Sequence, residues 1–443
     1  MDNRFSRRYF FLRGAALAAS NPLPARPASL KRAGYKPPNE KLNIAGIGAG
    51  GKGYGDVNAC ALTENIVALC DADEVRAART FERYPKATRY KDFRQMLDKE
   101  KGIDAVIVST PDHVHGIAAA WAIERGLHVY VQKPMTRTIW EARMLTELAR
   151  KHGVATQMGN QGHSNEGARR LCEMIWAGEI GAVREVHAWT DRPIWPQGID
   201  APLPEEPVPS TLDWDLWLGP APQRAYNKGY APFKWRGWFD FGCGALGDMA
   251  CHILDPVNWA LRLGAPTSVE CVKQEKRNSQ TFPTKSIIRF EFPARANMPP
   301  VTLYWYDGGL MPPRPSGLGP DVKLGDGSNG SLFIGEKGII TTGTYGEKTR
   351  LLPDEKMNGY KFPDPILTRS PGHYRDWIRA AKGGDAACSN FDYAGPFTEW
   401  VLLGTLAVRF EGKLLWDGQR MKVTNLAEAN RLIKPAYRKG WKI

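Results

Sequence analysis

The sequence predicts a two-domain α/β protein, with an N-terminal Rossmann-type domain built on a doubly wound parallel sheet and a second domain of the α+β class. Three observations support this fold class. Short apolar strands alternate with amphipathic helices from residue 41 to about residue 160. A glycine-rich turn, GIGAGGKG, follows the first strand. Beyond about Ser268 the apolar segments become rich in β-branched and aromatic residues, which favour strands.

The first domain is expected to contain five strands with helices between them. In chain order the strands are LNIAGIG, NIVALCDAD, IDAVIVSTP, LHVYVQKP and VATQMG. The first helix is expected directly after GIGAGGKG. The later helices are expected in EVRAARTFERY, DFRQMLDKE, HGIAAAWAIERG and TIWEARMLTELARKHG. A parallel sheet wound in this way binds its ligand at the carboxyl ends of the strands. The residues that follow each strand are therefore the first candidates for a binding site.

The second domain is expected to contain strands in TSVECVKQ, KSIIRFEF, VTLYWYDGG and SLFIGEKGIITTGTYG. A loop rich in proline and glycine, LMPPRPSGLGPDVKLGDGSNG, interrupts them. Two helices, HYRDWIRAAKGG and FTEWVLLGTLAVRFEGK, follow towards the C-terminus.

The turn after the first strand matches G-x-G-x-x-G, the pattern that binds the pyrophosphate of a dinucleotide. The residues expected to hold the pyrophosphate are Gly48, Ala49, Gly50 and Gly53. Glycine is required because the turn is tight and the phosphates must approach backbone amides at the start of a helix. Gly46, Gly48 and Gly51 match the same pattern, but Ile47, the last apolar residue of the strand, favours the first register.

Asp71 ends the second strand, 23 residues after Gly48. This spacing is close to the roughly 20 residues expected for the acid that bonds the adenosine ribose. A carboxylate here disfavours a 2′-phosphate, and the first arginine that follows is Arg76. NAD is therefore the predicted cofactor, with NADP less favoured. A simple strand-end cap is the alternative role for Asp71.

A second glycine-rich run, GCGALGDMACHILD, places a carboxylate and an imidazole four positions apart. On a helix, residues at that spacing project from one face, so Asp248 and His252 can act on a common point. Three interpretations stay open: an acid–base pair, a metal site completed by His113 and His115, or a cap beside a packed histidine. A bare pair is insufficient for a catalytic zinc, so no metal is predicted.

Composition excludes several classes of protein. The chain has 443 residues, and its seven cysteines include no C-x-x-C pair, which argues against a disulfide framework and a zinc knuckle. The net charge is +13, but residues 1–41 hold nine Lys/Arg against two Asp/Glu. Because more than half of the excess lies in this segment and no basic stripe with interleaved aromatics follows, nucleic acid is not a predicted partner.

The N-terminal segment SRRYFFLRGAALAAS pairs Arg7 and Arg8 with two phenylalanines and an Ala-rich stretch. It resembles a twin-arginine export signal, so residues 1–40 are interpreted as signal and linker, and a periplasmic or extracytoplasmic location is predicted. The alternative is a basic tail on a cytoplasmic protein. No later stretch approaches 18 consecutive apolar residues, so no stable membrane insertion is expected after export.

Five motifs in order carry a resemblance to a known family: IGAGGKG, CDAD, STPDHVH, VYVQKP and GCGALGDMACH. Together they are similar to the glucose-fructose oxidoreductase and inositol dehydrogenase family, from about Lys41 to the C-terminus. The resemblance implies a dinucleotide-binding domain over residues 41–160. It implies a substrate-binding domain over residues 161–443, with a large open, mostly antiparallel sheet that often forms the oligomer interface. A homo-oligomer is therefore expected.

Carried over by position, the resemblance assigns Lys133, in QKP, to the family's signature lysine, and Asp248 and His252 to its acid and histidine. Oxidation of a hydroxyl requires a base beside the cofactor. His252, expected to titrate near neutrality, is the predicted base, with Lys133 polarising the oxygen and Asp248 binding substrate or tuning both. The sequence departs from the family at Gln132, where glutamate is usual, and the lost charge alters the surroundings of Lys133.

The resemblance also places the STP segment along the cofactor. Thr110 and Pro111 are expected to neighbour the nicotinamide, together with Gln132 and Lys133 after the next strand. Asp112 is expected to cap the following helix. His115 is expected either to reach the site or to pack.

The substrate is indicated by composition alone. Aromatic faces beside hydrogen-bonding side chains suit sugar rings, and the segment TDRPIWPQG combines such residues. The segment NQGHS follows a strand and is expected either to face the site or to begin the second domain. The predicted substrate-binding residues are Asp191, Arg192, Trp195, Asn160 and Gln161. Trp214 and Trp217 are expected to be structural.

Three functions from different classes remain. The first is an NAD-dependent oxidoreductase acting on CH–OH groups of a sugar, cyclitol or glycoside. The second is a glycoside-cleaving enzyme with tightly bound NAD, working by transient oxidation, elimination and re-reduction. The third is a non-catalytic NAD-binding protein, which the retained Lys133, Asp248 and His252 disfavour.

Overall fold

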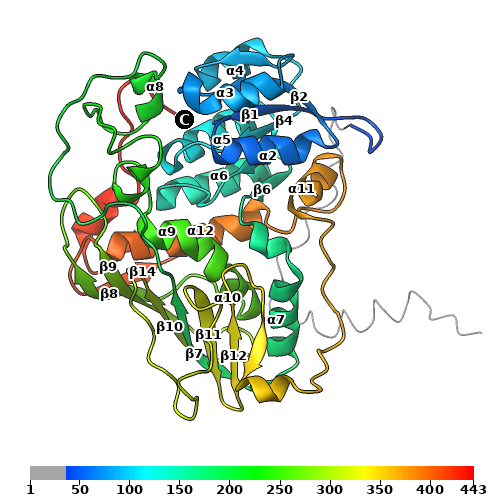
Figure 1. Cartoon of the computed structure of the whole chain (residues 1–443), viewed down its shortest axis with the longest axis vertical. Helices are drawn as coiled ribbons and strands as arrows, with labels where there is room; N and C mark the ends of the chain where they lie inside the picture. The colour runs from blue at the N-terminus through cyan, green and yellow to red at the C-terminus, as the bar shows by residue number, and fades with distance from the viewer. Residues whose placement is uncertain (1–35) are drawn as a thin grey trace, which may run out of the picture.

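The computed structural model describes residues 36–443, in which two sheets lie one above the other with helices around and between them (Figure 1). The predicted twin-arginine segment with Arg7 and Arg8 lies outside the described residues. Within residues 36–443, no helix combines the length and the apolar character needed to cross a membrane.

Six parallel strands form the first sheet, in the order β3-β2-β1-β4-β5-β6, which confirms the predicted doubly wound domain. The strands are β1 (Asn43–Ile47), β2 (Asn65–Cys70), β3 (Thr88–Tyr90), β4 (Ala105–Val108), β5 (His128–Val131) and β6 (Thr156–Met158). The central strands β1 and β4 are almost wholly buried, as expected of a sheet covered on both faces. The sequence does not predict β3, because its three residues are solvent-accessible and form no apolar run.

Five helices cover this sheet: α2 (Lys52–Ala61), α3 (Glu74–Arg83), α4 (Phe93–Lys99), α5 (Asp112–Glu124) and α6 (Ile139–His152). Capping chemistry fixes several of their ends. Asp73 accepts a hydrogen bond from the amide of Arg76 at the start of α3. Thr138 forms a capping box with Glu141 at the start of α6, and α6 ends at Gly153 in the left-handed conformation.

Nine strands form the second sheet, in the order β13-β12-β11-β7-β10-β9-β8-β14-β15. The strands are β7 (Val183–Trp189), β8 (Ser268–Glu275), β9 (Lys285–Phe292), β10 (Val301–Tyr306), β11 (Gly330–Gly335), β12 (Ile339–Thr342), β13 (Arg350–Leu352), β14 (Lys413–Asp417) and β15 (Lys422–Val423). Neighbouring strands are antiparallel except β7 and β10, which confirms the large, mostly antiparallel sheet. The sequence does not predict β7, because Arg184, Glu185 and His187 break its apolar pattern.

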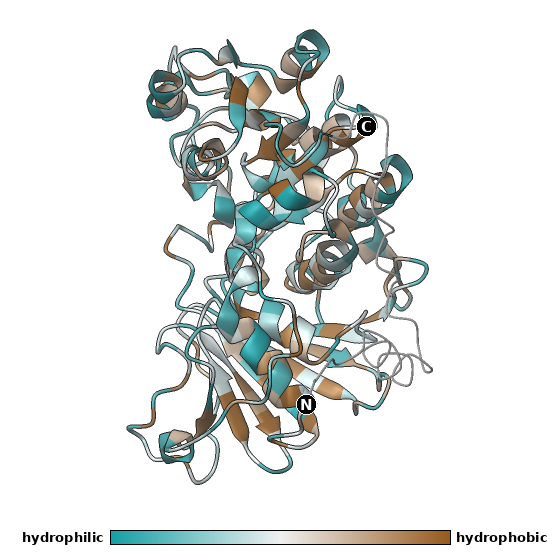
Figure 2. Cartoon of the chain, turned by 90° about the vertical axis from the view of Figure 1, so that its right-hand side faces the viewer, coloured by the Kyte–Doolittle hydropathy of each residue, from teal (hydrophilic) through white to brown (hydrophobic). Residues whose placement is uncertain are grey.

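The remaining helices connect and cover the two sheets. They are α7 (Glu166–Trp176), α8 (Trp214–Leu218), α9 (Gly244–Ile253), α10 (Asp255–Ala260), α11 (His373–Ala381) and α12 (Phe391–Ala407), with short 3-10 helices η1 (Gln161–Ser164), η2 (Lys234–Gly237), η3 (Asp354–Met357) and η4 (Ala427–Leu432). α9 and α12 lie between the sheets (Figure 1). Trp400 of α12 packs edge-on against Phe290 and Phe292 of β9, and α12 also contacts α6. One apolar core therefore continues from the first domain into the second sheet, whose strands carry much of the apolar character seen in Figure 2.

The chain returns to the first domain near its C-terminus. α11 packs against α2, and its Trp377 and Ile378 join a buried cluster with Leu42 and Ile44. The C-terminus itself lies beside the first domain (Figure 1). α11 therefore lies with the first domain, although it falls in the range expected for the second.

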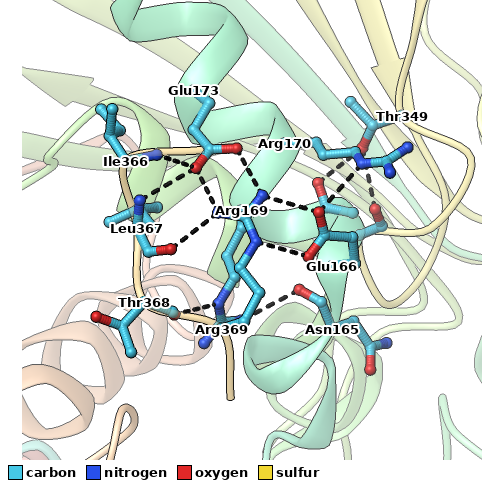
Figure 3. Close-up of polar contacts among 12 residues, drawn as sticks. Asn165, Glu166, Arg169, Arg170, Glu173, Thr349, Ile366, Leu367, Thr368 and Arg369 are labelled. Atoms are coloured by element: carbon cyan, nitrogen blue, oxygen red, sulfur yellow. Dashed lines mark hydrogen bonds and ion pairs between the residues drawn. The ribbon is translucent and has the colours of Figure 1, made fainter. Parts of the chain in front are cut away.

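The segment between η3 and α11 is fastened along α7 by ion pairs (Figure 3). Arg369 contacts the carboxylates of Glu166 (2.8 Å) and Glu173 (2.5 Å). Glu173 also accepts hydrogen bonds from the backbone amides of Ile366 (2.8 Å) and Leu367 (3.1 Å). We call Glu166, Glu173 and Arg369 the α7 clamp.

Candidate active site

A cleft of about 380 Å³ opens at the carboxyl ends of the central strands of the first sheet, where ligands of doubly wound folds bind. One wall comes from the turns after β1, β2, β4 and β5, and the other from α9, from segments that precede α9 in the chain and from the turn that carries Tyr345. The residues that carry the argument are Gly48, Gly50, Asp71, Thr110, Lys133, Asp248 and His252, and all of them line this cleft.

The glycine turn has the shape that a dinucleotide phosphate requires. Gly48 has a φ of 79°, and a Cβ there would lie 2.7 Å from the backbone of Ser109. A Cβ on Gly53 would overlap the carbonyl oxygen of Gly48. Because side chains are excluded at both positions, a ligand can approach the backbone of the turn closely, which supports the register Gly48, Gly50 and Gly53.

Asp71 follows β2 and faces the same turn. Its carboxylate accepts hydrogen bonds from the backbone amides of Gly50 (2.9 Å) and Asp73 (3.0 Å). Burial raises the pKa of Asp71 to about 6. Ala49 is buried and takes no part in the lining, because its amide is turned to the carbonyl of Cys70 (3.2 Å).

The STP segment follows β4 and runs along the cleft. Thr110 and Pro111 line it, and the buried hydroxyl of Thr110 has no hydrogen-bond partner among residues 36–443. Both ring nitrogens of His115 lie 2.8 Å from backbone carbonyls, those of Thr110 and Pro134, and burial lowers its pKa to about 4. His115 therefore fastens two cleft-lining turns to each other.

Asp112 corrects one prediction. It is the first residue of α5, the N-cap position is Pro111, and no side chain caps this helix end. The Asp112 carboxyl is instead buried in the cleft wall, where burial raises its pKa to about 7 and the charges of Arg236 and Asp248 act on it. The cap role expected for Asp112 is therefore wrong.

Lys133 and Asp248 form an ion pair in the cleft. The Lys133 ammonium donates to the backbone carbonyl of Asp248 (2.6 Å) and to its carboxylate Oδ1 (3.0 Å). Nε of Arg236 donates to the same carboxylate oxygen (3.2 Å). Burial alone would raise the pKa of Asp248, but Lys133 and Arg236 together outweigh it and hold that pKa at about 2. Asp248 is therefore ionised near neutral pH.

His252 lies one turn after Asp248 on the cleft-facing side of α9. Its buried Nδ1 has no partner in the part of the chain that the structure describes, and its ring packs edge-on against Tyr345 at 4.8 Å. Burial, with the Lys133 charge nearby, lowers the pKa of His252 well below its ordinary value. The expectation that His252 titrates near neutrality is therefore wrong, and its imidazole is neutral at pH 7 with one ring nitrogen free.

Gln132 also lines the cleft, beside Lys133. Its side-chain amide donates to the buried carboxylate of Asp56 (2.9 Å). A glutamate at residue 132 would set two carboxylates against each other, so the amide is matched to Asp56.

The cleft residues that sequence reasoning missed include Lys52, Arg236 and Tyr345. Arg236 lies in KWRGWFD, where an arginine between two tryptophans was the available signal. Tyr345 lies in the turn between β12 and β13, and nothing in the sequence indicates that this turn reaches α9.

The predicted substrate-binding residues separate into two groups. Arg192 and Gln161 line the cleft. Asp191, Trp195 and Asn160 do not belong to its lining: Asp191 forms an exposed ion pair with Arg192, and the other two side chains are buried elsewhere. Only the first group is therefore placed to contact a ligand directly.

His113 packs, as do the two tryptophans expected to be structural. Its ring nitrogens lie 2.8 Å and 3.3 Å from the backbone carbonyls of Trp217 and Phe241. Trp214 and Trp217 are buried and stacked at 4.7 Å, and Trp217 also lines the cleft. No group of three or more His, Cys, Asp or Glu side chains that could hold a metal ion occurs within residues 36–443. His113 is thus not available as a ligand beside Asp248.

A phosphate-binding type of glycine turn and a lysine–aspartate pair that meet in one cleft define a two-domain, dinucleotide-dependent oxidoreductase. The chain belongs to the Gfo/Idh/MocA oxidoreductase family. A model of the family's NAD-binding Rossmann fold matches residues 41–160, and a model of its C-terminal alpha/beta domain matches residues 183–293. The first domain is thus an NAD-binding domain.

Curated relatives match parts of the chain. The inositol 2-dehydrogenase of Salmonella typhimurium is 28% identical over 152 residues, which cover 33% of this chain and 44% of the relative. Glycosyl hydrolase family 109 protein 1 of Akkermansia muciniphila is 29% identical over 173 residues, which cover 36% of this chain and 35% of the relative. The chain therefore aligns with less than half the length of these relatives.

Solved structures share the fold over most of the chain. The WlbA dehydrogenase of Bordetella pertussis, in complex with NADH and UDP-GlcNAcA, has a TM-score of 0.59 at 16% identity and covers 85% of this chain and 99% of its own. An inositol dehydrogenase homolog of Azotobacter vinelandii, in complex with NADH and myo-inositol, has a TM-score of 0.54 at 17% identity, with 85% and 98% covered. At these identities the likeness shows the fold alone.

Proposed function

We propose that the chain is an NAD-dependent oxidoreductase that transfers hydride between nicotinamide and a hydroxyl-bearing carbon of a sugar, cyclitol or glycoside. One observation carries the proposal: His252, neutral and with a free ring nitrogen, lines the same cleft as the Lys133–Asp248 pair and the glycine turn. Alcohol oxidation requires such a proton acceptor beside the cofactor. Similarity to inositol 2-dehydrogenase supports a cyclitol or sugar as substrate.

The residues of the cleft divide the chemistry among them. NAD, when bound, supplies the hydride acceptor. The Lys133 ammonium has three donors, of which Asp248 takes two, so the third is free to bond the substrate oxygen. His252 accepts the hydroxyl proton, and Asp248 keeps the ammonium in place. Gln161 and Arg192 offer hydrogen bonds to other hydroxyls.

The choice of NAD over NADP belongs to the same proposal. Asp71 lies at the end of β2 with two backbone amides fixing its carboxylate towards the glycine turn. A carboxylate in this position bonds a free 2′-hydroxyl and repels a 2′-phosphate.

A second candidate is glycoside cleavage by an enzyme that keeps NAD bound. The similarity to glycosyl hydrolase family 109 protein 1 favours it. In this cycle a ring hydroxyl would be oxidised, the acidified neighbouring C–H would lose its proton and the aglycone would be eliminated. Water would then add to the unsaturated ketone that remains, and the hydride would be returned. The same Lys133 and His252 serve the oxidation in both candidates.

One experiment separates the two candidates. The purified protein is offered free sugars, inositols and aryl glycosides, and NADH absorbance and aglycone release are recorded together. Stoichiometric NADH with added NAD supports the oxidoreductase, whereas aglycone release without accumulating NADH supports glycoside cleavage. Silence in both channels, with NAD bound, would leave a non-catalytic NAD-binding protein.

We propose export by the twin-arginine route for the full chain, on the strength of Arg7 and Arg8. Export of a folded protein suits an enzyme that takes up its cofactor in the cytoplasm. Replacing both arginines with lysine in a bacterial host, followed by cell fractionation, tests the proposal. An unchanged compartment contradicts it.

A further inference from the structure

Asp56, on α2 behind the glycine turn, is a fully buried carboxylate that accepts hydrogen bonds from four side chains. The donors are the Lys52 ammonium, the Ser109 hydroxyl (2.7 Å), the Gln132 amide (2.9 Å) and the Tyr374 hydroxyl (2.6 Å). They come from α2, the turn after β4, the end of β5 and α11. Because a buried carboxylate is tolerated only when paired and hydrogen-bonded, Asp56 fixes four segments around one point.

Three of these donors, Lys52, Ser109 and Gln132, line the cleft. Tyr374 reaches the cleft through others, because its hydroxyl lies 3.1 Å from the Lys52 ammonium and 3.4 Å from the amide of Gln161. The glycine turn, the strand end that carries Lys133 and a predicted substrate-binding residue therefore share one hydrogen-bond network.

Lys52 occupies the turn itself, immediately before Gly53. Its side chain is half exposed to the cleft, and its charge is close enough to lower the pKa of His252. An ammonium at this place faces both the phosphates of a dinucleotide and the reacting end of the cleft.

We propose that Asp56 is a positioning residue for the cofactor cleft. It holds Lys52 directly, so that this ammonium faces the bound dinucleotide, and it holds the strand end that carries Lys133 through the amide of Gln132. The inference rests on the proposed NAD-dependent function of the same cleft, and it adds a residue that touches neither cofactor nor substrate.

The direction of the Gln132–Asp56 hydrogen bond makes the proposal specific. Residue 132 is the donor and residue 56 the acceptor. A glutamate at residue 132 cannot donate unless one carboxyl of the pair holds a proton, and two carboxylates at this separation raise each other's pKa. An asparagine at residue 56 can supply the missing donor. Two combinations are therefore compatible: aspartate at residue 56 with glutamine at residue 132, and asparagine at residue 56 with glutamate at residue 132.

The other titratable groups that face Asp56 are Lys52 and Cys60 of α2, Tyr130 of β5 and Tyr374 of α11. Burial raises the pKa of Cys60, Tyr130 and Tyr374 above the ordinary values. These three groups stay protonated through neutral and mildly alkaline pH and do not imitate the titration of an introduced glutamate.

The test measures NADH affinity by fluorescence titration in four proteins: the unaltered chain, Asp56→Asn, Gln132→Glu and the double variant. Each single substitution is expected to weaken NADH binding about tenfold, the usual scale for a broken pair in a network. The loss in Gln132→Glu should shrink as the pH is lowered, because a protonated carboxyl at residue 132 can again donate to residue 56. The double variant is expected to bind NADH better than either single variant, with no such pH dependence.

Asp307→Asn is the matched control. Asp307 is also a buried carboxylate, bonded to Ser286 and Trp305 in the second domain, and it does not line the cofactor cleft. Its substitution should lower the unfolding midpoint without changing NADH affinity. Equal NADH affinity in all four proteins overturns the positioning role alone, as does a double variant that is worse than both singles. An unaltered chain that fails to bind NADH overturns the proposed function itself.

Discussion

Helices α7 and α9 each present polar side chains on successive turns, but they differ in whether every buried polar atom has a hydrogen-bond partner. On α7, Glu173 is satisfied by Arg369 and by two backbone amides (Figure 3). On α9, Asp248 is likewise paired, but His252 four residues later has a buried ring nitrogen with no partner among the described residues. The first set closes on itself, whereas the second remains open towards a cleft.

This difference distinguishes a cluster of residues that stabilises the fold from one that can bind a ligand or take part in a reaction. Buried polar atoms in folded proteins are almost always hydrogen-bonded, so an exception inside a cleft calls for a ligand or a reaction. The α7 clamp needs nothing further, because each of its carboxylates already has a cation. Lys133, Asp248 and His252, which we call the α9 cluster, offer a neutral base and a spare ammonium donor, which are useful only to a bound substrate.

The largest expected effect is in the α9 cluster. Lys133→Ala should lower turnover by about a hundredfold or more, the usual contribution of a positioned acid–base group. NADH binding should stay nearly normal, because the glycine turn and Asp71 hold the other end of the cofactor. Steady-state kinetics on the substrate found in the panel, with parallel NADH titration, measures both. Loss of binding and turnover in equal proportion would contradict the division of roles.

Asp112 should make the free energy of unfolding of the protein depend on pH. Its pKa is about 7 in the fold against an ordinary 3.8, so the folded state keeps a proton that the unfolded chain loses above about pH 4. Stability should therefore fall as pH rises from about 4 to about 7, by at most roughly 4 kcal/mol. Denaturant unfolding of the protein and of Asp112→Asn across this range tests the sign. A variant with the same slope as the unaltered protein would remove Asp112 as the cause.

The α7 clamp should give the opposite pH dependence of stability, with stability lost as the pH falls. Glu173 has a lowered pKa, since Arg369 and backbone amides outweigh its burial, so its contribution is present above its ordinary pKa and lost on acidification. Glu173→Gln should cost about 2 kcal/mol of stability, because the buried carboxylate that accepts from Arg369 loses its charge while Arg369 keeps only Glu166, with turnover of the folded protein unchanged. Glu166→Gln is the control, because that side chain is 45% exposed and should cost less than about 1 kcal/mol. A drop in turnover without a drop in unfolding free energy would link the clamp to catalysis.

The smallest effect concerns the cofactor. NAD should bind about tenfold more tightly than NADP, because Asp71 bonds the ribose hydroxyl and repels a 2′-phosphate. Asp71→Ser should narrow the difference by improving NADP binding. Calorimetric titration with NAD and with NADP measures both affinities. Equal affinities, or tighter binding of NADP, in the unaltered protein would contradict the prediction.

Much of the first domain could be predicted from local pattern. The apolar runs ending at Ile47 and Cys70 are buried strands, and the glycines after Ile47 lie where side chains are excluded. The contact between Lys133 and Asp248 was indicated by the family motifs, although 115 residues separate them. Strand β7 could not be predicted, because Arg184 and Glu185 are exposed and His187, although polar, is buried against Tyr306 of the neighbouring strand.

The rest of the site depended on tertiary structure. Tyr345 reaches His252 only because β12 and β13 place their turn beside α9. The neutral state of His252 and the raised pKa of Asp112 come from burial, which no motif encodes. Trp195 has the composition expected of a sugar site, yet its side chain is buried outside the cleft lining. The spacing of residues in the sequence indicated which of them share a helix face, but not which other parts of the chain that face contacts.

The central claim is that His252 accepts the substrate proton during hydride transfer in this cleft. Single-turnover reduction of bound NAD, followed by absorbance at neutral pH with a substrate from the panel, tests it most directly. His252→Ala, loaded with NAD to the same occupancy as the unaltered protein, should reduce its cofactor about a hundredfold or more slowly. Reduction at the unaltered rate would contradict the claim and leave the α9 histidine, like the α7 clamp, as part of the packing.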